Sequence, residues 1–124
     1  MKKPYFEAIP ALRDVDLENS WLIDFTESAT SIRMTIEAVL SKRHPLYHPP
    51  VDGEALCYRD AVLVFDGITS TAWSNKVFAK NTGPGGEVDY GNIDSFYQDE
   101  DGWCIGGEWG RLRVACETVT FRLV

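Results

Sequence analysis

The chain of 124 residues is short of basic side chains. Its 12 Lys and Arg stand against 19 Asp and Glu, which leaves a net charge of −7. Nucleic acids and anionic membranes are bound by clustered Lys and Arg, so neither is expected as a partner. The same charge suits a basic protein partner, which a negative surface attracts from a distance. It is also the charge of many small proteins in which it serves only solubility.

Paired cysteines and long apolar runs are missing too. The three cysteines are Cys57, Cys104 and Cys116. A secreted disulfide scaffold is expected to carry an even set, so we expect reduced, mostly buried thiols and a cytoplasmic location. The basic residues 2–3 are followed by Pro4 and Glu7 rather than by an apolar segment. We therefore expect neither a signal peptide nor a membrane span.

The common catalytic motifs are absent. The glycine-rich segment 81–86 lacks both the Gly-Lys-Ser/Thr ending of a P-loop and the spacing of a dinucleotide site, and we expect a plain loop. Ser20 and Ser74 have no nucleophile-elbow motif around them. Cys57 precedes an apolar run, where an inert packed thiol is more common than a nucleophile. The sequence thus favours a binding protein over an enzyme, with no catalytic residue and no cofactor.

What the chain does contain is a stretch, residues 90–110, that is rich in aromatic side chains, glycines and carboxylates. The pair Asp101-Gly102 lies between two β-rich runs and predicts a hairpin turn, because glycine tolerates the positive φ of tight turns. In the first run, the alternation predicts that Ile93, Ser95 and Tyr97 share one face.

The second run of this hairpin predicts a face made of Trp103, Ile105, Gly107 and Trp109. Each indole ring can bury on the order of 200 Å², so the two tryptophans are expected to dominate a small core. Two consecutive glycines, Gly106 and Gly107, indicate a bulge or a close approach by another backbone.

Three segments define the rest of the pattern. Ser31 to Leu40 alternates with a period of two, and a helix would place Met34 and Ala38 on the wrong side, so a strand is predicted. Residues 41–53 contain three prolines and predict a loop. Tyr58 to Asp66 is the most apolar run and predicts a central strand buried on both faces.

Together with runs at 15–17, 21–25, 68–73 and 118–124, these segments predict about seven or eight short strands. The expected fold is a single all-β domain spanning 1–124, either an antiparallel sandwich or a partly open barrel. One short helix is allowed within 5–13 or 70–80. The predicted core comprises Ile36, Leu63, Phe65, Trp103, Ile105, Trp109, Val114 and Phe121.

Carboxylates gather around the predicted hairpin. The candidate binding surface consists of Asp89, Tyr90, Asp94, Asp99, Glu100, Asp101 and Glu108. Tyrosine is over-represented at interface hot spots, which favours a protein interface. Because Asp94 and Glu108 lie on neighbouring predicted strands, a carboxylate pair like that of glycosidases, about 5–10 Å apart, is an alternative. Another is that Glu108 forms a solvent-side ion pair with Arg111 or Arg113.

The two histidines, His44 and His48, have the His-x-x-x-His spacing that binds one metal ion when it lies on a helix. The prolines of this segment exclude the helix. A metal site would need a third ligand from elsewhere, and Glu37, Asp52 and Glu54 are the candidates. The alternative is a rigid surface loop without metal.

The sequences Tyr90-Gly-Asn-Ile-Asp-Ser-Phe and Gly107-Glu-Trp-Gly-Arg-Leu-Arg-Val, with His-Pro-Leu-Tyr at 44–47, resemble small, acidic, uncharacterised bacterial proteins. Some families of this kind accompany secreted toxins as immunity proteins. The resemblance covers residues 40–124 and carries no catalytic residue. It implies a cytoplasmic protein that binds another protein and performs no chemistry.

We therefore expect a non-enzymatic protein-binding module, of the kind that neutralises a basic toxin or nuclease. The alternative, from another class, is a β-barrel that binds a small ligand or a sugar, with or without weak hydrolase activity. It would use Trp and Tyr for stacking and Asp94 or Glu108 for polar contacts. A cavity inside the sheet would favour the barrel, and a filled core would favour the binding module.

Overall fold

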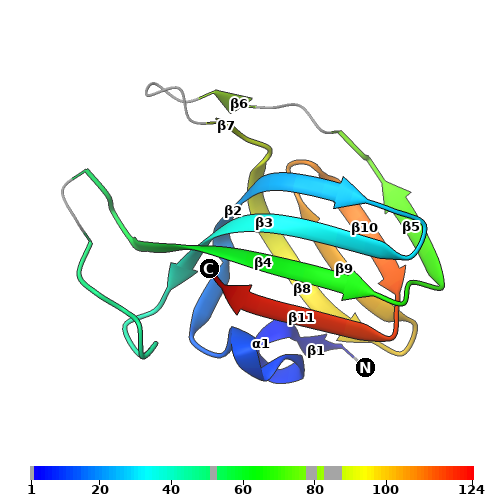
Figure 1. Ribbon diagram of the computed structural model, residues 1–124, viewed down its shortest axis with the longest axis horizontal. Coiled ribbons are helices and arrows are strands. Elements are labelled where there is room, and N and C mark those ends of the chain that lie inside the picture. The colour runs from blue at the N-terminus through cyan, green and yellow to red at the C-terminus, as the bar shows by residue number, and fades with distance from the viewer. Residues whose placement is uncertain (1, 51–52, 78–80, 83–87) are drawn as a thin grey trace.

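A computed structural model describes residues 2–50, 53–77, 81–82 and 88–124 (Figure 1). Its elements in chain order are β1 (Lys3–Pro4), α1 (Tyr5–Ala8), η1 (Pro10–Leu12), β2 (Val15–Glu27), β3 (Ser31–Leu40), β4 (Cys57–Asp66), β5 (Ser70–Ser74), β6 (Asn81–Thr82), β7 (Val88–Asp89), β8 (Gly91–Asp99), β9 (Gly102–Gly107), β10 (Gly110–Ala115) and β11 (Thr118–Leu123). The predicted all-β antiparallel class is confirmed. Short helical turns lie within 5–13, the first of the two segments that allowed a helix.

Nine strands form one open sheet, in the order β11-β4-β3-β2-β8-β9-β10-β5, with β1 pairing onto β8. The strand β2 pairs with β8 at only two positions, Trp21 with Asn92 and Leu22 with Gly91. The sheet folds over at this short junction into two layers, and Figure 1 shows β2, β3, β4 and β11 in front of β8, β9 and β10. The strands β6 and β7 pair separately, and the predicted loop at 81–86 otherwise lies outside the described residues.

The core lies between the two layers. The predicted core residues are all buried, none more than 8% exposed: Ile36, Leu63, Phe65, Trp103, Ile105, Trp109, Val114 and Phe121. The strand β3 has the predicted bounds, and Ile32, Met34 and Ile36 point inward with no exposed surface. Alternation thus predicted this strand correctly because one of its faces meets the core.

The central position of β4, between β3 and β11, is also confirmed. Burial on both faces holds only in part. Ala61, Leu63 and Phe65 are fully buried on the inner side, whereas on the outer side Val62 is buried and Asp60 is exposed. The outer face of this layer borders solvent, so the unbroken apolar run of β4 did not mean that both faces of the strand are buried.

The strand β2 joins two predicted strands into one, and it does so across an irregular segment between Asp16 and Trp21. Ser20, which is fully buried, satisfies backbone groups there: its hydroxyl donates to the Asp16 carbonyl (2.8 Å) and accepts from the Val39 N–H (2.9 Å). The Tyr5 hydroxyl donates to the Val15 carbonyl and accepts from the Leu17 N–H, both at 3.1 Å. These bonds attach α1 to the start of β2.

The predicted alternation along β8 is wrong. Ile93 pairs with Gly107 and Ser95 with Gly106, so β8 advances by two residues where β9 advances by one. With this shift, the inward positions of β8 are Ile93 and Phe96. Such a bulge inserts one residue and changes the face of every residue after it. Tyr97 therefore lies on the outer face, while Ile93 remains inside.

The predicted hairpin is confirmed, although its two turn residues are Glu100 and Asp101 rather than Asp101 and Gly102. Gly102 already pairs with Asp99 as the first residue of β9, and it has φ +134°. Within the described residues, no helix combines the length and the apolar composition that crossing a membrane requires.

Candidate functional site

The predicted binding residues separate into groups along β8. The first group is the acidic turn, which we define as Asp99, Glu100 and Asp101. At the other end of the strand lie Asp89, Tyr90 and, in the turn between β9 and β10, Glu108. An extended strand rises about 3.3 Å per residue, so Tyr90 and Asp99 are roughly 30 Å apart. The fold does not gather these residues into one compact patch.

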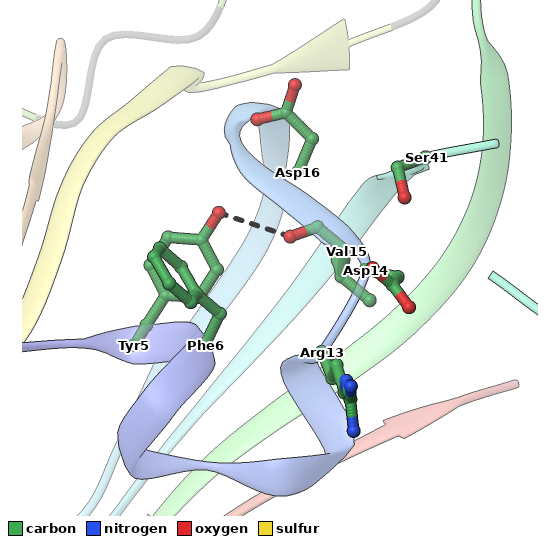
Figure 2. Close-up of a pocket in the computed structure, with 7 residues that line it drawn as sticks. All are labelled: Tyr5, Phe6, Arg13, Asp14, Val15, Asp16 and Ser41. Carbon is green, nitrogen blue, oxygen red and sulfur yellow. Dashed lines mark hydrogen bonds between the residues drawn. The ribbon is translucent and has the colours of Figure 1, made fainter. Parts of the chain in front are cut away.

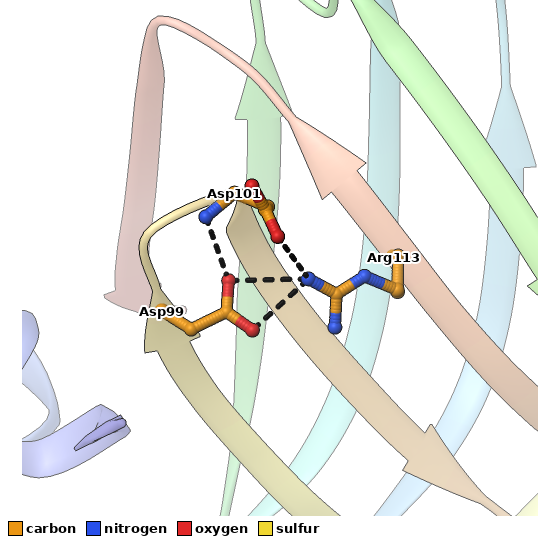
Figure 3. A network of polar contacts seen from close by, with 3 residues as sticks. All are labelled: Asp99, Asp101 and Arg113. Carbon is orange, nitrogen blue, oxygen red and sulfur yellow. Dashed lines mark hydrogen bonds and ion pairs between the residues drawn. The ribbon is translucent and has the colours of Figure 1, made fainter. Parts of the chain in front are cut away.

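The acidic turn is anchored by Arg113 of β10 (Figure 3). Its Nη2 atom lies 3.1 and 2.9 Å from the two carboxylate oxygens of Asp99 and 3.8 Å from an Asp101 oxygen. The Asp101 N–H also donates to Asp99, at 2.9 Å. The Asp99 side chain is consequently only 15% exposed, whereas that of Asp101 is 86% exposed.

These contacts change the titration of Asp99. The hydrogen bond from the Arg113 guanidinium is the main cause that holds the pKa of Asp99 below its ordinary value, and the Asp101 N–H adds to it. Both donors favour the charged carboxylate over the neutral acid. Asp99 therefore holds the turn in shape, and Asp101 is the carboxylate that projects.

Asp94, in the middle of β8, lies 3.8 Å from Nη2 of Arg111, and both side chains are about half exposed. Arg111 also donates to the Ser95 hydroxyl at 2.9 Å. The two arginines of β10 thus contact Asp94 and the acidic turn, rather than Glu108 as the alternative ion pair required. The alternation of Arg111 and Arg113 on one strand was the sequence signal for a shared outer face.

The residues at the far end of β8 are held by backbone contacts. An Asp89 carboxylate oxygen accepts from the Gly91 N–H at 2.8 Å, and the Tyr90 N–H donates to the Leu22 carbonyl at 2.8 Å. The Glu108 side chain lies against Gly91, whose φ is +111° and where a Cβ atom would come within 2.7 Å of its carboxylate. Glu108 thus lies against Gly91 and Asp94 against Arg111, and both side chains are exposed.

The histidines lie in the loop between β3 and β4. Nδ1 of His44 accepts from the Leu46 N–H, and Nδ1 of His48 lies 3.0 Å from the Pro49 carbonyl oxygen. Among the described residues, no three His, Cys, Asp or Glu side chains are grouped as metal ligands would be. Of the candidate third ligands, Asp52 lies outside the described residues. The three cysteines, all of them described, are free thiols.

A feature that the sequence reasoning missed is a pair of adjoining grooves at the end of the molecule where α1 meets the start of β2. The first, which we call the helix groove, has a volume of about 430 Å³ (Figure 2). Its lining comprises Tyr5, Phe6, Arg13, Asp14, Val15, Asp16 and Ser41. Phe6 is 48% exposed there.

The second groove, the loop groove, has a volume of about 400 Å³ and lies between the β3–β4 loop and the ends of those strands. Its lining comprises Asp16, Val39, Leu40, Ser41, Lys42, Tyr47, Pro50, Ala55, Leu56 and Cys57. Asp16 and Ser41 belong to both grooves and form the saddle between them. The helix groove is lined by residues within 5–16 and by Ser41, whereas the loop groove combines Asp16 with residues within 39–57. No local motif indicated either groove.

No protein-family model matches the chain, and no curated protein and no solved structure was found to match it either. The resemblance to immunity-type proteins therefore stays a prediction, and function has to be inferred from the surface of the molecule.

Proposed function

We propose that the protein is a non-enzymatic binding module for a basic protein partner, with the immunity-type neutralisation of a toxin in the cytoplasm as its specific form. The observation that carries this proposal is the acidic turn held by Arg113. Asp101 projects with 86% of its side chain exposed, from a turn whose shape is already set by the bonds to Asp99. A preorganised charged group loses little freedom on binding.

The packing of the interior supports a binding module over the ligand-binding barrel. Side chains on both layers, such as Met34, Leu63 and Ile105, are fully buried. A ligand cavity inside the sheet would expose the side chains around it. Asp94 and Glu108, one of which the barrel hypothesis needs at a cavity mouth, are both exposed on the surface and contact Arg111 and Gly91 respectively.

The experiment is affinity purification of the tagged chain from its native cell at low salt, followed by mass spectrometry of what is retained. We expect one stoichiometric basic protein. The double variant Glu100→Lys/Asp101→Lys should slow association and weaken the dependence of the association rate on salt. Charged residues at the solvent-exposed edge of an interface act mainly on the rate of association. Asp99 is left intact because it anchors the turn.

The pair of substitutions Asp60→Lys/Asp66→Lys is the matched control, since both residues are exposed on the outer face of β4 in the other layer. It changes the net charge in the same direction at a site away from the acidic turn. Equal association rates for wild type, control and double variant would remove the acidic turn as the binding surface. Absence of any retained protein would contradict the proposed function itself.

A further inference from the structure

Exposed apolar side chains gather at the two grooves. Of the large apolar residues that are exposed in the described part of the chain, Phe6 lines the helix groove and Leu56 the loop groove, 48% and 40% exposed, and Leu46 belongs to the same β3–β4 loop. Apolar surface that a protein leaves uncovered in clusters marks sites of interaction.

One wall of the helix groove and the floor of the loop groove are packed against the core. The Phe6 ring packs edge-on against Tyr5 at 5.3 Å, and Tyr5 stacks on Phe96 of the core at 6.1 Å. The floor of the loop groove is made by Val39, Leu40 and other residues at the strand ends that are at most 3% exposed. A bound segment would therefore meet a formed surface with a low cost of ordering.

The saddle between the grooves is acidic. The Asp16 carboxylate accepts from the Asn19 side chain at 2.7 Å, which fixes its position, and Asp14 lies two residues away in the helix-groove lining. The cationic side chains belong to one groove each, Arg13 to the helix groove and Lys42 to the loop groove. Figure 2 shows the Arg13 guanidinium directed away from Asp16. Charge complementarity at the saddle thus favours a cation.

We propose that the two grooves form one docking site for an extended segment of a basic protein, in which a Lys or Arg stands between two apolar side chains. In an extended chain every second side chain faces the same way, about 7 Å apart. The expected pattern is therefore apolar-x-basic-x-apolar, with the basic residue over Asp16. The inference rests on the proposed function only in that the partner is a basic protein; neither groove lining contains a residue of the acidic turn.

The probe is a capped peptide, Leu-Ser-Lys-Ser-Leu, added to the isotope-labelled full chain and followed by NMR amide shifts. We expect shifts at Asp16, Ser41 and Leu56. Replacing either Leu of the peptide by Ser should weaken binding about tenfold, because burial of a Leu side chain is worth at least that factor. Replacing its Lys by Glu should weaken binding by a similar factor.

On the protein, Phe6→Ala and Leu56→Ser should each weaken binding about tenfold, since each removes one apolar wall. Val77→Ser is the matched control, because Val77 is 56% exposed and lines neither groove. Asp16→Asn should remove the preference for Lys over Gln in the peptide. Unchanged melting temperatures show that these variants are folded.

Three results overturn the proposal: no shifts at millimolar peptide, equal binding by the Phe6, Leu56 and Val77 variants, or a wild-type dimer that Leu56→Ser dissociates. The last would identify a second copy of the chain as the occupant. If a basic partner is retained from the cell but binds the Phe6 and Leu56 variants normally, the docking site is wrong and the proposed function stands. If the peptide binds but no partner is retained from the cell, the docking site stands and the proposed function is wrong.

Discussion

Arg113 decides what each carboxylate of the acidic turn does. It forms its short contacts with Asp99, at 2.9 and 3.1 Å, and only a longer one with Asp101. Since the Asp99 carboxylate is used inside this network, it is a poor candidate for a direct contact with a partner. Asp101, which makes only the longer contact and is 86% exposed, is the carboxylate of this pair at which charge reversal disturbs the Arg113 contacts less.

The titration of Asp99 tests whether Arg113 holds this carboxylate in the turn. The folded carboxyl titrates below its ordinary pKa of 3.8, because the Arg113 hydrogen bond and then the Asp101 N–H favour the charged form. The contribution of Asp99 to stability is thus fully present above pH 3.8, the value of the unfolded chain, and is lost as the pH falls through the lower pKa of the folded state.

In Arg113→Gln we expect the pKa of Asp99 to rise toward its ordinary value. NMR titration of the side-chain carboxyl carbons measures it directly. Arg111→Gln is the control, because Arg111 contacts Asp94 and should leave the titration of Asp99 as it is. A pKa of Asp99 that stays low in Arg113→Gln would mean that the guanidinium is not the cause.

At the scale of the elements, β9 depends on a close approach at its last residue. A Cβ atom at Gly107 would collide with the Asn92 carbonyl oxygen of β8, and the Glu108 N–H donates to that same carbonyl. At the preceding position, the atoms nearest to a Cβ at Gly106 would belong to side chains, the Arg111 guanidinium at 3.0 Å and the Ser95 hydroxyl at 3.2 Å. The two neighbouring glycines therefore differ in how well each position can accept a side chain.

We expect Gly107→Ala to destabilise the fold by about 2 kcal/mol or more, because the backbones of two strands must move apart. Gly106→Ala should cost less than about 1 kcal/mol, since the Arg111 side chain can shift. Urea unfolding of both variants gives the comparison. Equal losses would show that the approach of Gly107 to Asn92 is not what requires a glycine there.

For the whole molecule, the open sheet has a seam where the two layers meet without pairing. The strand β5 is the last in the order, yet its Trp73 ring lies 5.5 Å from Phe25 near the end of β2. Lys76 and Glu27 approach to 3.4 Å across the same seam. Figure 1 shows β5 beside the hairpin of β2 and β3, where the Ile68 N–H donates to the Thr30 carbonyl.

Side-chain packing rather than charge should hold this seam. Trp73→Ala is expected to cost about 3 kcal/mol, the lower end for a large aromatic, because the ring is half-buried against Phe25 and Trp109. Lys76→Gln should cost less than about 1 kcal/mol, since its ion pair is partly exposed to solvent. Urea unfolding distinguishes them, and a larger loss for Lys76→Gln would contradict this account.

Much of the architecture follows from local pattern. The bounds of β3, the hairpin between β8 and β9 and the core tryptophans Trp103 and Trp109 were predicted correctly. These features depend on alternation, on the conformational freedom of glycine and on apolar area, all of which are properties of a residue and its immediate neighbours. The all-β class follows from the same local rules.

The site could be predicted only in its composition. The sequence indicated an acidic turn, but not that Arg113 would hold Asp99 in it. The face exposed by Tyr97 depended on a bulge, which arises from how β8 pairs with β9. Which strands pair depends on the order of the strands in the sheet, and the alternation of apolar and polar residues does not encode that order.

By itself, then, the sequence determined the strands, the turns and the side chains that enter the core, because each is decided by local backbone preference and burial. The tertiary structure alone decided which charges meet and where surface grooves form. Phe6 and Leu56 are 50 residues apart in the sequence, yet each lines one of two grooves that share Asp16 and Ser41. Only the packing of α1 and the β3–β4 loop around the ends of the strands brings these side chains to one surface.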